Sequence, residues 1–140
     1  MTLGLAILGS GEIAATHLQS LKELSDFNIS YICDIDEEKA NDLAKNSPGS
    51  QIEKNMDMMI TNKEIDIVDI CLPPHLHFST ALKFLKADKH VICEKPLSTS
   101  VNEAQKLIDI SYSKNKNLYP VFQYRYGKHI LILKDLISKG

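Results

Sequence analysis

A glycine-containing stretch near the start of the chain has the residue types that can seat a diphosphate. Gly9-Ser10-Gly11-Glu12-Ile13-Ala14 follows an apolar run and opens a segment with helical spacing. Gly9 permits a tight turn, Gly11 lets the backbone approach a diphosphate, and small Ala14 lets the helix pack close to the strand. We expect residues 9–13 to contact the diphosphate, Glu12 through its backbone N–H, because its carboxylate would repel phosphate. Ordinary strand–helix turns also contain glycine, so these residues alone leave a dinucleotide site undecided.

An acidic residue stands where a dinucleotide site needs one. Asp34 lies 23 residues after Gly11, at the end of the apolar run 29–33. An acid at this place hydrogen-bonds the adenosine ribose and repels the 2′-phosphate of NADP. The next residue, Ile35, is not an arginine that could neutralise that phosphate, and we include it in the cofactor site. NAD is therefore favoured over NADP, although Asp34 could simply end a strand.

Two later apolar runs also end in residues able to do chemistry. The first run ends at Cys71 and is followed by Leu72-Pro73-Pro74-His75-Leu76-His77, and the second ends in Cys93-Glu94-Lys95-Pro96. Carboxyl ends of neighbouring strands are where ligands bind in doubly wound sheets. A lysine ammonium can stabilise a developing alkoxide there, but Lys95 could also be an ordinary solvated lysine before a proline turn.

No metal site is expected from the histidines and cysteines. His75 and His77 are two residues apart and face different ways on a helix, which makes a poor zinc pair. Cys33, Cys71 and Cys93 form no CxxC pair, and each lies in or ends an apolar run. Buried free thiols are the favoured interpretation.

Strand-like and helical segments alternate along the chain. The pattern predicts strands over 3–8, 29–33, 51–54, 65–72, 90–93 and 118–123, with helices between them and a last amphipathic helix over 130–137. Such alternation gives a mostly parallel sheet with right-handed crossovers and helices on both faces. The predicted fold is a doubly wound α/β (Rossmann) domain of six strands in the order 3-2-1-4-5-6.

Composition sets bounds on the class of protein. The 140 residues carry 44% hydrophobic and 24% charged side chains, which suits one globular domain. A net charge of −2 gives no reason to expect a nucleic acid or an anionic membrane as partner. We find no apolar run long enough to span a membrane and no basic leader, so we expect a cytoplasmic protein.

Taken together, these motifs resemble the Gfo/Idh/MocA family of oxidoreductases over essentially the whole chain. The resemblance rests on the glycine turn, Asp34, Leu72-Pro73 with His77, the run His90-Val91-Ile92-Cys93-Glu94-Lys95-Pro96, and Gln123-Tyr124-Arg125-Tyr126. The Glu-Lys-Pro sequence after the fifth strand is its most specific part.

The resemblance implies a role for each matching residue. Lys95 corresponds to the catalytic lysine that binds and polarises the substrate hydroxyl or carbonyl, and it also borders the cofactor. Glu94 corresponds to a residue beside the nicotinamide ribose. Leu72, Pro73 and Pro74 would line the cofactor groove, with Pro74 replacing the asparagine common in the family, and His77 matches the family histidine. The implied substrate is a sugar, an inositol or a related alcohol.

The resemblance also implies a domain organisation. Residues 1–123 would form the NAD(P)-binding domain, and residues 124–140 a bridging segment toward a C-terminal substrate domain that this sequence lacks. We therefore expect a truncated chain that binds NAD with little turnover. An uncovered apolar face on the last helix would allow homo-oligomers.

Two other functional classes stay open. A non-catalytic dinucleotide-binding or regulatory module would keep the same glycine turn and acid without the chemistry. An S-adenosylmethionine methyltransferase also uses a glycine turn and an acid after the second strand, but the Glu-Lys-Pro run has no role there.

Overall fold

A computed structural model of the protein describes residues 2–140. Its strands are β1 (Leu3–Leu8), β2 (Phe27–Cys33), β3 (Gln51–Glu53), β4 (Ile67–Ile70), β5 (His90–Cys93) and β6 (Leu118–Pro120). Its helices are α1 (Glu12–Leu21), α2 (Glu37–Ala44), α3 (Asp57–Ile60), α4 (Pro74–Lys86), α5 (Val101–Ser113), a 3-10 helix η1 (Gln123–Tyr126) and α6 (Lys128–Lys139). Among these residues, no helix combines the length and apolar character that a membrane span requires.

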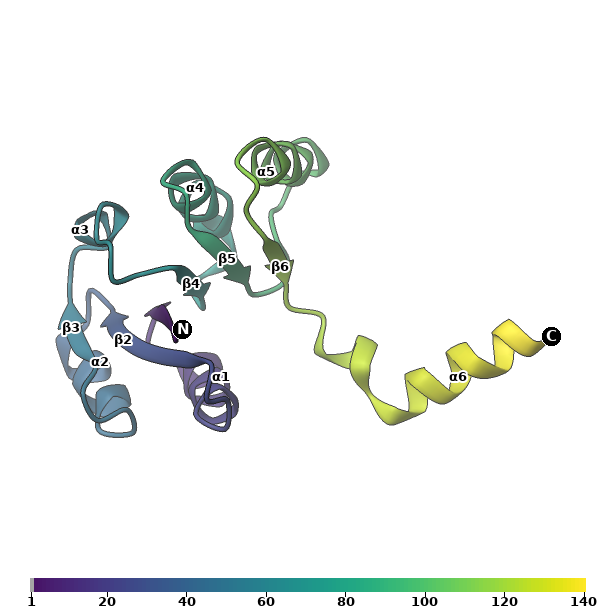
Figure 1. Ribbon diagram of the computed structural model, residues 1–140, viewed down its shortest axis with the longest axis horizontal. Coiled ribbons are helices and arrows are strands. Elements are labelled where there is room, and N and C mark those ends of the chain that lie inside the picture. Colours follow the sequence, from purple (N-terminus) through teal and green to yellow (C-terminus); the bar gives the residue numbers. More distant parts are fainter. Residues whose placement is uncertain (1) are drawn as a thin grey trace.

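The six strands form one sheet in the order β3-β2-β1-β4-β5-β6, and every pair of neighbours is parallel. Helices α1 and α2 cover one face of this sheet, and α3, α4 and α5 cover the other (Figure 1). The strand order reverses between β1 and β4, which places a crevice at their carboxyl ends. The predicted doubly wound α/β fold and its strand order are confirmed.

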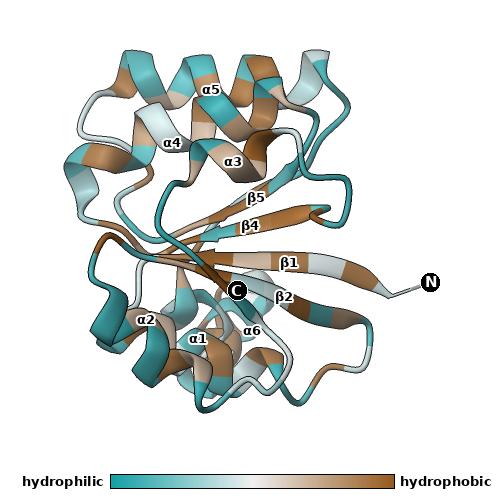
Figure 2. Ribbon diagram, turned by 90° about the vertical axis from the view of Figure 1, so that its left-hand side faces the viewer, coloured by the Kyte–Doolittle hydropathy of each residue, from teal (hydrophilic) through white to brown (hydrophobic). Residues whose placement is uncertain are grey.

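Alternating side chains of β1 explain why both faces are covered. Leu5 and Ile7 pack into the core with α1 and α2, whereas Ala6 and Leu8 pack into the core on the other face, and all four are fully buried. Because successive side chains of a strand point to opposite faces, an apolar residue at every position requires a helical layer on each side. Figure 2 shows these largely apolar strands between helices in which hydrophilic and hydrophobic residues alternate.

Capping residues and proline mark the starts of some helices but not of all. Asp36 precedes α2 and its carboxylate accepts a hydrogen bond from Lys39 N at 3.3 Å, as a helix cap does. Pro74 occupies the first turn of α4, where a missing N–H costs nothing. Ser100 precedes α5, but its side chain does not cap the helix. Its backbone bonds to Ser98, whose Oγ accepts from Ser100 N and donates to Ser100 O.

The end of the chain differs from the predicted pattern. The strand predicted over 118–123 stops at Pro120, and η1 follows it. Helix α6 forms as predicted but extends away from the sheet (Figure 1), and none of its residues is buried. Five of its apolar residues are at least half exposed: Leu131, Ile132, Leu133, Leu136 and Ile137.

Candidate functional site

A pocket of about 560 Å³ lies at the carboxyl ends of β1, β2 and β4. Its lining includes seven of the predicted site residues: Gly9, Ser10, Gly11, Asp34, Ile35, Leu72 and Pro73. Three separate segments of the sequence therefore meet at the switch point of the sheet, where the fold predicts a ligand.

The two glycines of the turn do different work. Gly9 has φ +96°, and a Cβ there would lie 2.6 Å from Cys71 O, so only glycine fits without strain. The N–H of Gly9 donates to Cys33 O at 2.8 Å, which fixes the turn to the end of β2. A Cβ on Gly11 would meet no heavy atom within 4 Å. Gly9 is thus required by the fold, whereas Gly11 borders open space.

The start of α1 presents hydrogen-bond donors to that space. Gly11 is the N-cap of α1 and has no side chain with which to cap it. The first-turn N–H groups of a helix have no partner within the helix, and they carry its positive dipole end. Ser10 Oγ is buried and has no hydrogen-bond partner among residues 2–140. Glu12 is exposed and lines an adjoining pocket, so its carboxylate can point to solvent.

Asp34 holds the same turn from the side of β2. Its carboxylate accepts hydrogen bonds from Ser10 N at 2.7 Å and from Asp36 N at 2.9 Å. Two lysines line this end of the pocket, but Lys39 pairs with Asp36 at 3.2 Å and Lys54 pairs with Glu37. The nearby cations are therefore already matched by carboxylates.

His77 connects the turns that follow β4 and β5. It is 1% exposed, with Nε2 2.7 Å from Leu72 O and Nδ1 2.7 Å from Pro96 O. Both ring nitrogens are thus taken up by protein carbonyls, and the ring does not line the pocket. This geometry does not support the direct cofactor contact expected of His77, which instead holds the two turns together.

The Glu-Lys-Pro segment has an exposed lysine and a buried acid. Lys95 and Pro96 are exposed, and the peptide bond between them is cis. Pro74 is exposed at the start of α4. Glu94 is 6% exposed, and its carboxylate faces inward rather than into the large pocket. Its Oε2 accepts from Lys95 N at 3.1 Å, and its Oε1 lies 3.1 Å from His17 Nε2.

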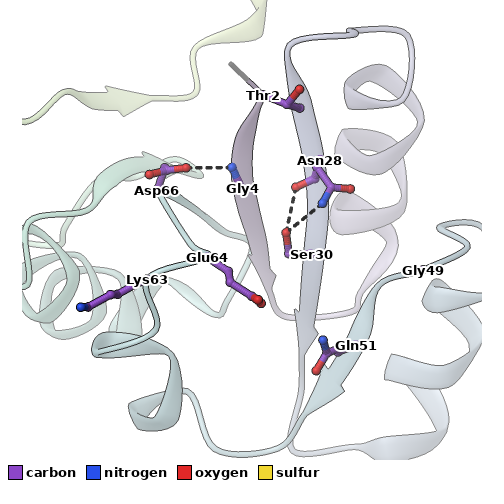
Figure 3. Close-up of a pocket in the computed structure, with 9 residues that line it drawn as sticks. All are labelled: Thr2, Gly4, Asn28, Ser30, Gly49, Gln51, Lys63, Glu64 and Asp66. Carbon is purple, nitrogen blue, oxygen red and sulfur yellow. Dashed lines mark hydrogen bonds between the residues drawn. The ribbon is translucent and has the colours of Figure 1, made fainter.

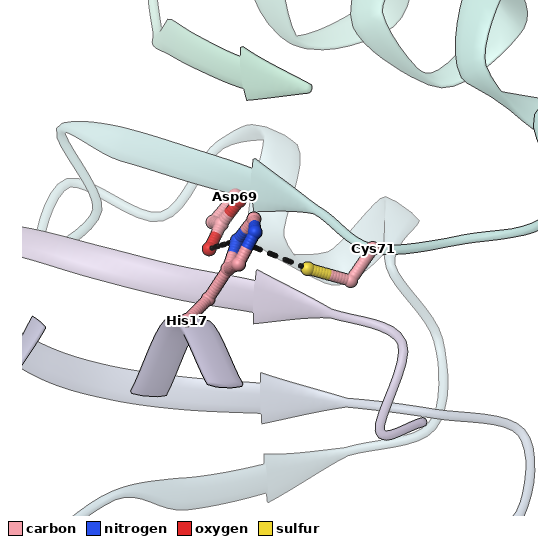
Figure 4. Close-up of side chains that lie close together, drawn as sticks. All are labelled: His17, Asp69 and Cys71. Atoms are coloured by element: carbon pink, nitrogen blue, oxygen red, sulfur yellow. Dashed lines mark hydrogen bonds and ion pairs between the residues drawn. The ribbon is translucent and has the colours of Figure 1, made fainter. Parts of the chain in front are cut away.

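His17 is the residue that the sequence interpretation missed. It points from α1 toward Asp69 of β4, with Nδ1 2.8 Å from Asp69 Oδ2 and 3.5 Å from Cys71 Sγ (Figure 4). The hydrogen bond to Asp69 raises the pKa of His17 against the opposing effect of burial. Burial together with the Asp69 and Glu94 charges raises the pKa of the Cys71 thiol far above its usual range. The signal in the sequence was Asp69 itself, because an acid inside an apolar strand needs a buried partner.

We consider this cluster hydrogen-bonded rather than metal-bound. His17, Asp69 and Cys71 are types that bind metals, and their ligand atoms lie within 4.8 Å of one another. Each ring nitrogen of His17 already faces a carboxylate oxygen at hydrogen-bond distance. A neutral buried thiol is also a poor metal ligand, because the thiolate is the form that binds.

A second pocket, of about 500 Å³, lies at the amino ends of the strands. Thr2, Asn28, Ser30, Gln51 and Glu64 line it with other residues (Figure 3). Several of its polar groups bond to one another: Asn28 donates to Ser30 Oγ, and Asp66 Oδ2 accepts from Gly4 N at 2.9 Å. This pocket contains none of the predicted site residues.

Comparison with known proteins agrees with the fold. Residues 3–122 match the model of the Gfo/Idh/MocA family, described as an oxidoreductase family with an NAD-binding Rossmann fold. Glucose-6-phosphate 3-dehydrogenase of Bacillus subtilis is 33% identical over 133 residues, covering 95% of this chain and 37% of that protein. Inositol 2-dehydrogenase of Salmonella typhimurium is 30% identical over 143 residues, and the match covers 100% of this chain and 43% of that protein.

A solved structure shows the same architecture. Myo-inositol dehydrogenase of Lactobacillus casei, in complex with NAD(H) and myo-inositol, is 26% identical and superposes with a TM-score of 0.91. The match covers 100% of this chain and 42% of that one, so the chain spans about two fifths of the length of its relatives. The chain belongs to the Gfo/Idh/MocA oxidoreductase family, and residues 3–122 are its NAD-binding Rossmann fold.

Proposed function

We propose that this chain is the NAD-binding part of an oxidoreductase that transfers a hydride between a nicotinamide and a sugar, inositol or related alcohol. The relatives named as inositol and glucose-6-phosphate dehydrogenases support this substrate class. The proposal concerns the cofactor half of the reaction, because the chain covers about two fifths of those proteins.

The observation that carries the proposal is the cradle formed by Ser10 and Gly11 at the start of α1. The buried Ser10 hydroxyl has no partner among residues 2–140, and no Cβ fills the space at Gly11. A diphosphate placed there would accept hydrogen bonds from this hydroxyl and from the first-turn N–H groups of α1. The residues present therefore fit the diphosphate of NAD.

Asp34 supports NAD over NADP. Its carboxylate lies beside the cradle, where it can accept a hydrogen bond from the adenosine ribose. A 2′-phosphate in that place would face the Asp34 charge, and the two nearby lysines are paired with other carboxylates. Ile35, which is 90% exposed, offers an apolar surface next to the acid.

Lys95 supplies the chemistry on the substrate side. Bound NAD provides the acceptor for the hydride. The Lys95 ammonium would hydrogen-bond the substrate oxygen and stabilise its negative charge as the C–H bond breaks. Complete catalysis also needs the substrate held against the nicotinamide and a placed acid or base. Lys95 meets only part of that need, so this chain should turn over little substrate.

Residues up to 123 form the NAD-binding domain in this proposal, and residues 124–140 form a bridging segment. The exposed apolar residues of α6 support a role in packing against another surface, either a substrate domain or a second copy of the chain. The cytoplasmic location predicted from the sequence stays a prediction.

Calorimetric titration of the chain with NAD, NADP and S-adenosylmethionine tests the proposal. We expect NAD to bind more tightly than NADP, and no heat of binding from S-adenosylmethionine. Absence of NAD binding, or binding of S-adenosylmethionine in its place, would contradict the proposal. A turnover assay with sugars and inositols should give little activity, and robust activity would refute the expectation that this chain lacks part of the catalytic machinery.

A further inference from the structure

His17 lies between two buried carboxylates that come from different strands. Its Nδ1 is 2.8 Å from Asp69 Oδ2, and its Nε2 is 3.1 Å from Glu94 Oε1. A carboxylate oxygen can only accept a hydrogen bond, so both ring nitrogens must carry a proton for both bonds to form. With both acids ionised, this geometry suits an imidazolium ion held between two carboxylates.

The surroundings favour that charged form. The groups that face the ring are Asp69 and Cys71 from β4 and the turn after it, and Glu94 from the end of β5. Asp69 is 1% exposed, and its second oxygen has no hydrogen-bond partner among the residues described. Asp69 and Glu94 are both buried, and one oxygen of Asp69 lacks a hydrogen bond within the described chain. Two buried carboxylates in this state are stabilised by a nearby cation.

The cluster leads directly to Lys95. Glu94 Oε2 accepts a hydrogen bond from the backbone N–H of Lys95 at 3.1 Å. Contacts thus run from Asp69 through His17 and Glu94 to the backbone of Lys95. Helix α1, which carries His17, is also the helix whose first turn borders the diphosphate cradle.

We propose that Asp69, His17 and Glu94 form a positioning cluster that fixes Lys95 relative to α1 and leaves its ammonium group free for the substrate. This rests on the proposed function, in which Lys95 polarises the substrate oxygen. Glu94 is the neighbour of Lys95 in sequence and would otherwise be a ready ion-pair partner for it. His17 holds one oxygen of Glu94 at 3.1 Å, and among residues 2–140 no carboxylate lies within ion-pair distance of the Lys95 ammonium. His17 and Glu94 act through Lys95 and are positioning residues.

Nuclear magnetic resonance of the whole chain without NAD tests the positioning cluster. We expect both ring nitrogens of His17 to be protonated at neutral pH, with a titration midpoint above the ordinary 6.5. The backbone amide of Lys95 should shift with the same midpoint, because Glu94 joins the two groups. Asp69→Asn should lower the midpoint of both signals together. The matched variant Asp109→Asn, on the exposed side of α5, should leave both unchanged.

A second readout concerns the ammonium group of Lys95. In His17→Gln, Glu94 loses its cation and should pair with the Lys95 ammonium, which slows the exchange of the ammonium protons with water relative to the wild type. Replacing a residue that only supported the fold would not change this exchange rate in a folded variant. If a variant does not fold, the wild type decides the question: the Lys95 backbone amide signal either follows the ionisation of His17 or does not.

Three results would overturn the proposal. They are a neutral His17 ring at neutral pH, a Lys95 amide that does not follow the ionisation of His17, or Zn²⁺ that binds and displaces the His17 proton. The last would show a metal site instead. All of these measurements omit NAD, so a failure to bind NAD would count against the proposed function and leave this test intact.

Discussion

The two edges of the sheet carry pockets of similar size but of different character. The pocket at the carboxyl ends is about 560 Å³ and has the start of α1 at its border. The pocket at the amino ends is about 500 Å³ and is lined by polar groups such as Ser30, Glu64 and Asp66 (Figure 3). At the amino edge several polar groups bond to one another, whereas at the carboxyl edge Ser10 Oγ has no protein partner among residues 2–140.

The difference shows that pocket volume does not identify the site. In a parallel sheet with crossover helices, the helices begin at the carboxyl edge and end at the amino edge. Positive helix ends therefore gather at one edge and negative ends at the other. An anionic diphosphate is therefore favoured at the carboxyl edge. The pocket at the amino edge also has two acids, Glu64 and Asp66, against one lysine, Lys63, whereas the two acids of the other pocket are matched by two lysines.

The largest effect on stability is expected for substitution of Gly4, which lies at the amino edge and has no predicted role in binding. A Cβ on Gly4 would lie 1.7 Å from the backbone oxygen of Glu64, so Gly4→Ala must move the backbone. We expect a loss of about 3 kcal/mol or more in the free energy of unfolding, measured by chemical denaturation. Gly49→Ala is the control. It has a positive φ but open space, and should cost about 1 kcal/mol. A Gly4→Ala protein as stable as this control would show that the amino edge is not tightly packed there.

A glycine substitution at the carboxyl edge should weaken NAD binding without a large loss of stability. Gly11→Val places side-chain atoms in the open space at the start of α1. The free energy of unfolding should change by about 1 kcal/mol or less, because the backbone of Gly11 is extended. NAD affinity, measured by calorimetry, should fall at least about tenfold, or about 1.4 kcal/mol. Unchanged affinity would mean that the diphosphate does not lie there.

Two aspartates that each accept backbone N–H groups give a further comparison. Asp34→Asn should reduce the preference for NAD over NADP about tenfold, because the charge that repels the 2′-phosphate is lost. Asp66→Asn removes a carboxylate bonded to Gly4 N at the other edge and should leave NAD affinity unchanged. Each change should cost about 1 kcal/mol of stability. If Asp66→Asn changed the preference for NAD over NADP and Asp34→Asn did not, the NAD site would have to lie at the amino edge instead.

The smallest effect is the pH dependence of stability, which should have opposite signs for two histidines. The pKa of His17 is raised above 6.5, so its contribution is present below pH 6.5 and lost as the pH rises through the raised value. Burial and the nearby Lys116 lower the pKa of His90. The contribution of His90 is therefore present above pH 6.5 and lost as the pH falls through the lowered value.

Denaturation of the wild type, His17→Gln and His90→Gln between about pH 5 and about pH 8 measures both effects. The advantage of the wild type over His17→Gln should shrink as the pH rises, by about 1.4 kcal/mol for each unit by which the pKa of His17 is raised. Its advantage over His90→Gln should shrink as the pH falls. If the advantage of the wild type changed with pH in the same direction for both variants, the environments described for His17 and His90 would be contradicted.

Most of the fold follows from patterns that are local in the sequence. The continuous apolar run of β1 predicts a strand covered on both faces, and Gly9 marks the turn that only glycine fits. Asp36 and Pro74 mark helix starts. The end of the last strand was harder to predict. Val121 and Phe122 suit a strand, but the paired register of β6 with β5 ends at Pro120, and only the N–H of Val121 still reaches β5, at Cys93 O.

The candidate site was predicted where backbone geometry decides, and less well where tertiary contacts decide. Gly9, Gly11 and Asp34 meet because the fold brings those turns together. The direction of the Glu94 carboxylate depends on His17, a residue 77 positions earlier on another element. His77 likewise turns to two carbonyls that no local pattern reveals. Pairings between side chains that are distant in the sequence cannot be predicted from local patterns. The single acid within the apolar strand, Asp69, does indicate that such a partner exists.

The most direct test of the central claim is a map of backbone amide shifts while NAD is added to the labelled chain. We predict that shifts concentrate at Gly9 to Ile13 and around Asp34 and Leu72, all at the carboxyl edge. Gly4, Ser30 and Asp66 at the amino edge should stay unchanged. Shifts centred on the amino edge, or no saturable shifts at all, would contradict the assignment of an NAD site to the carboxyl edge of this sheet.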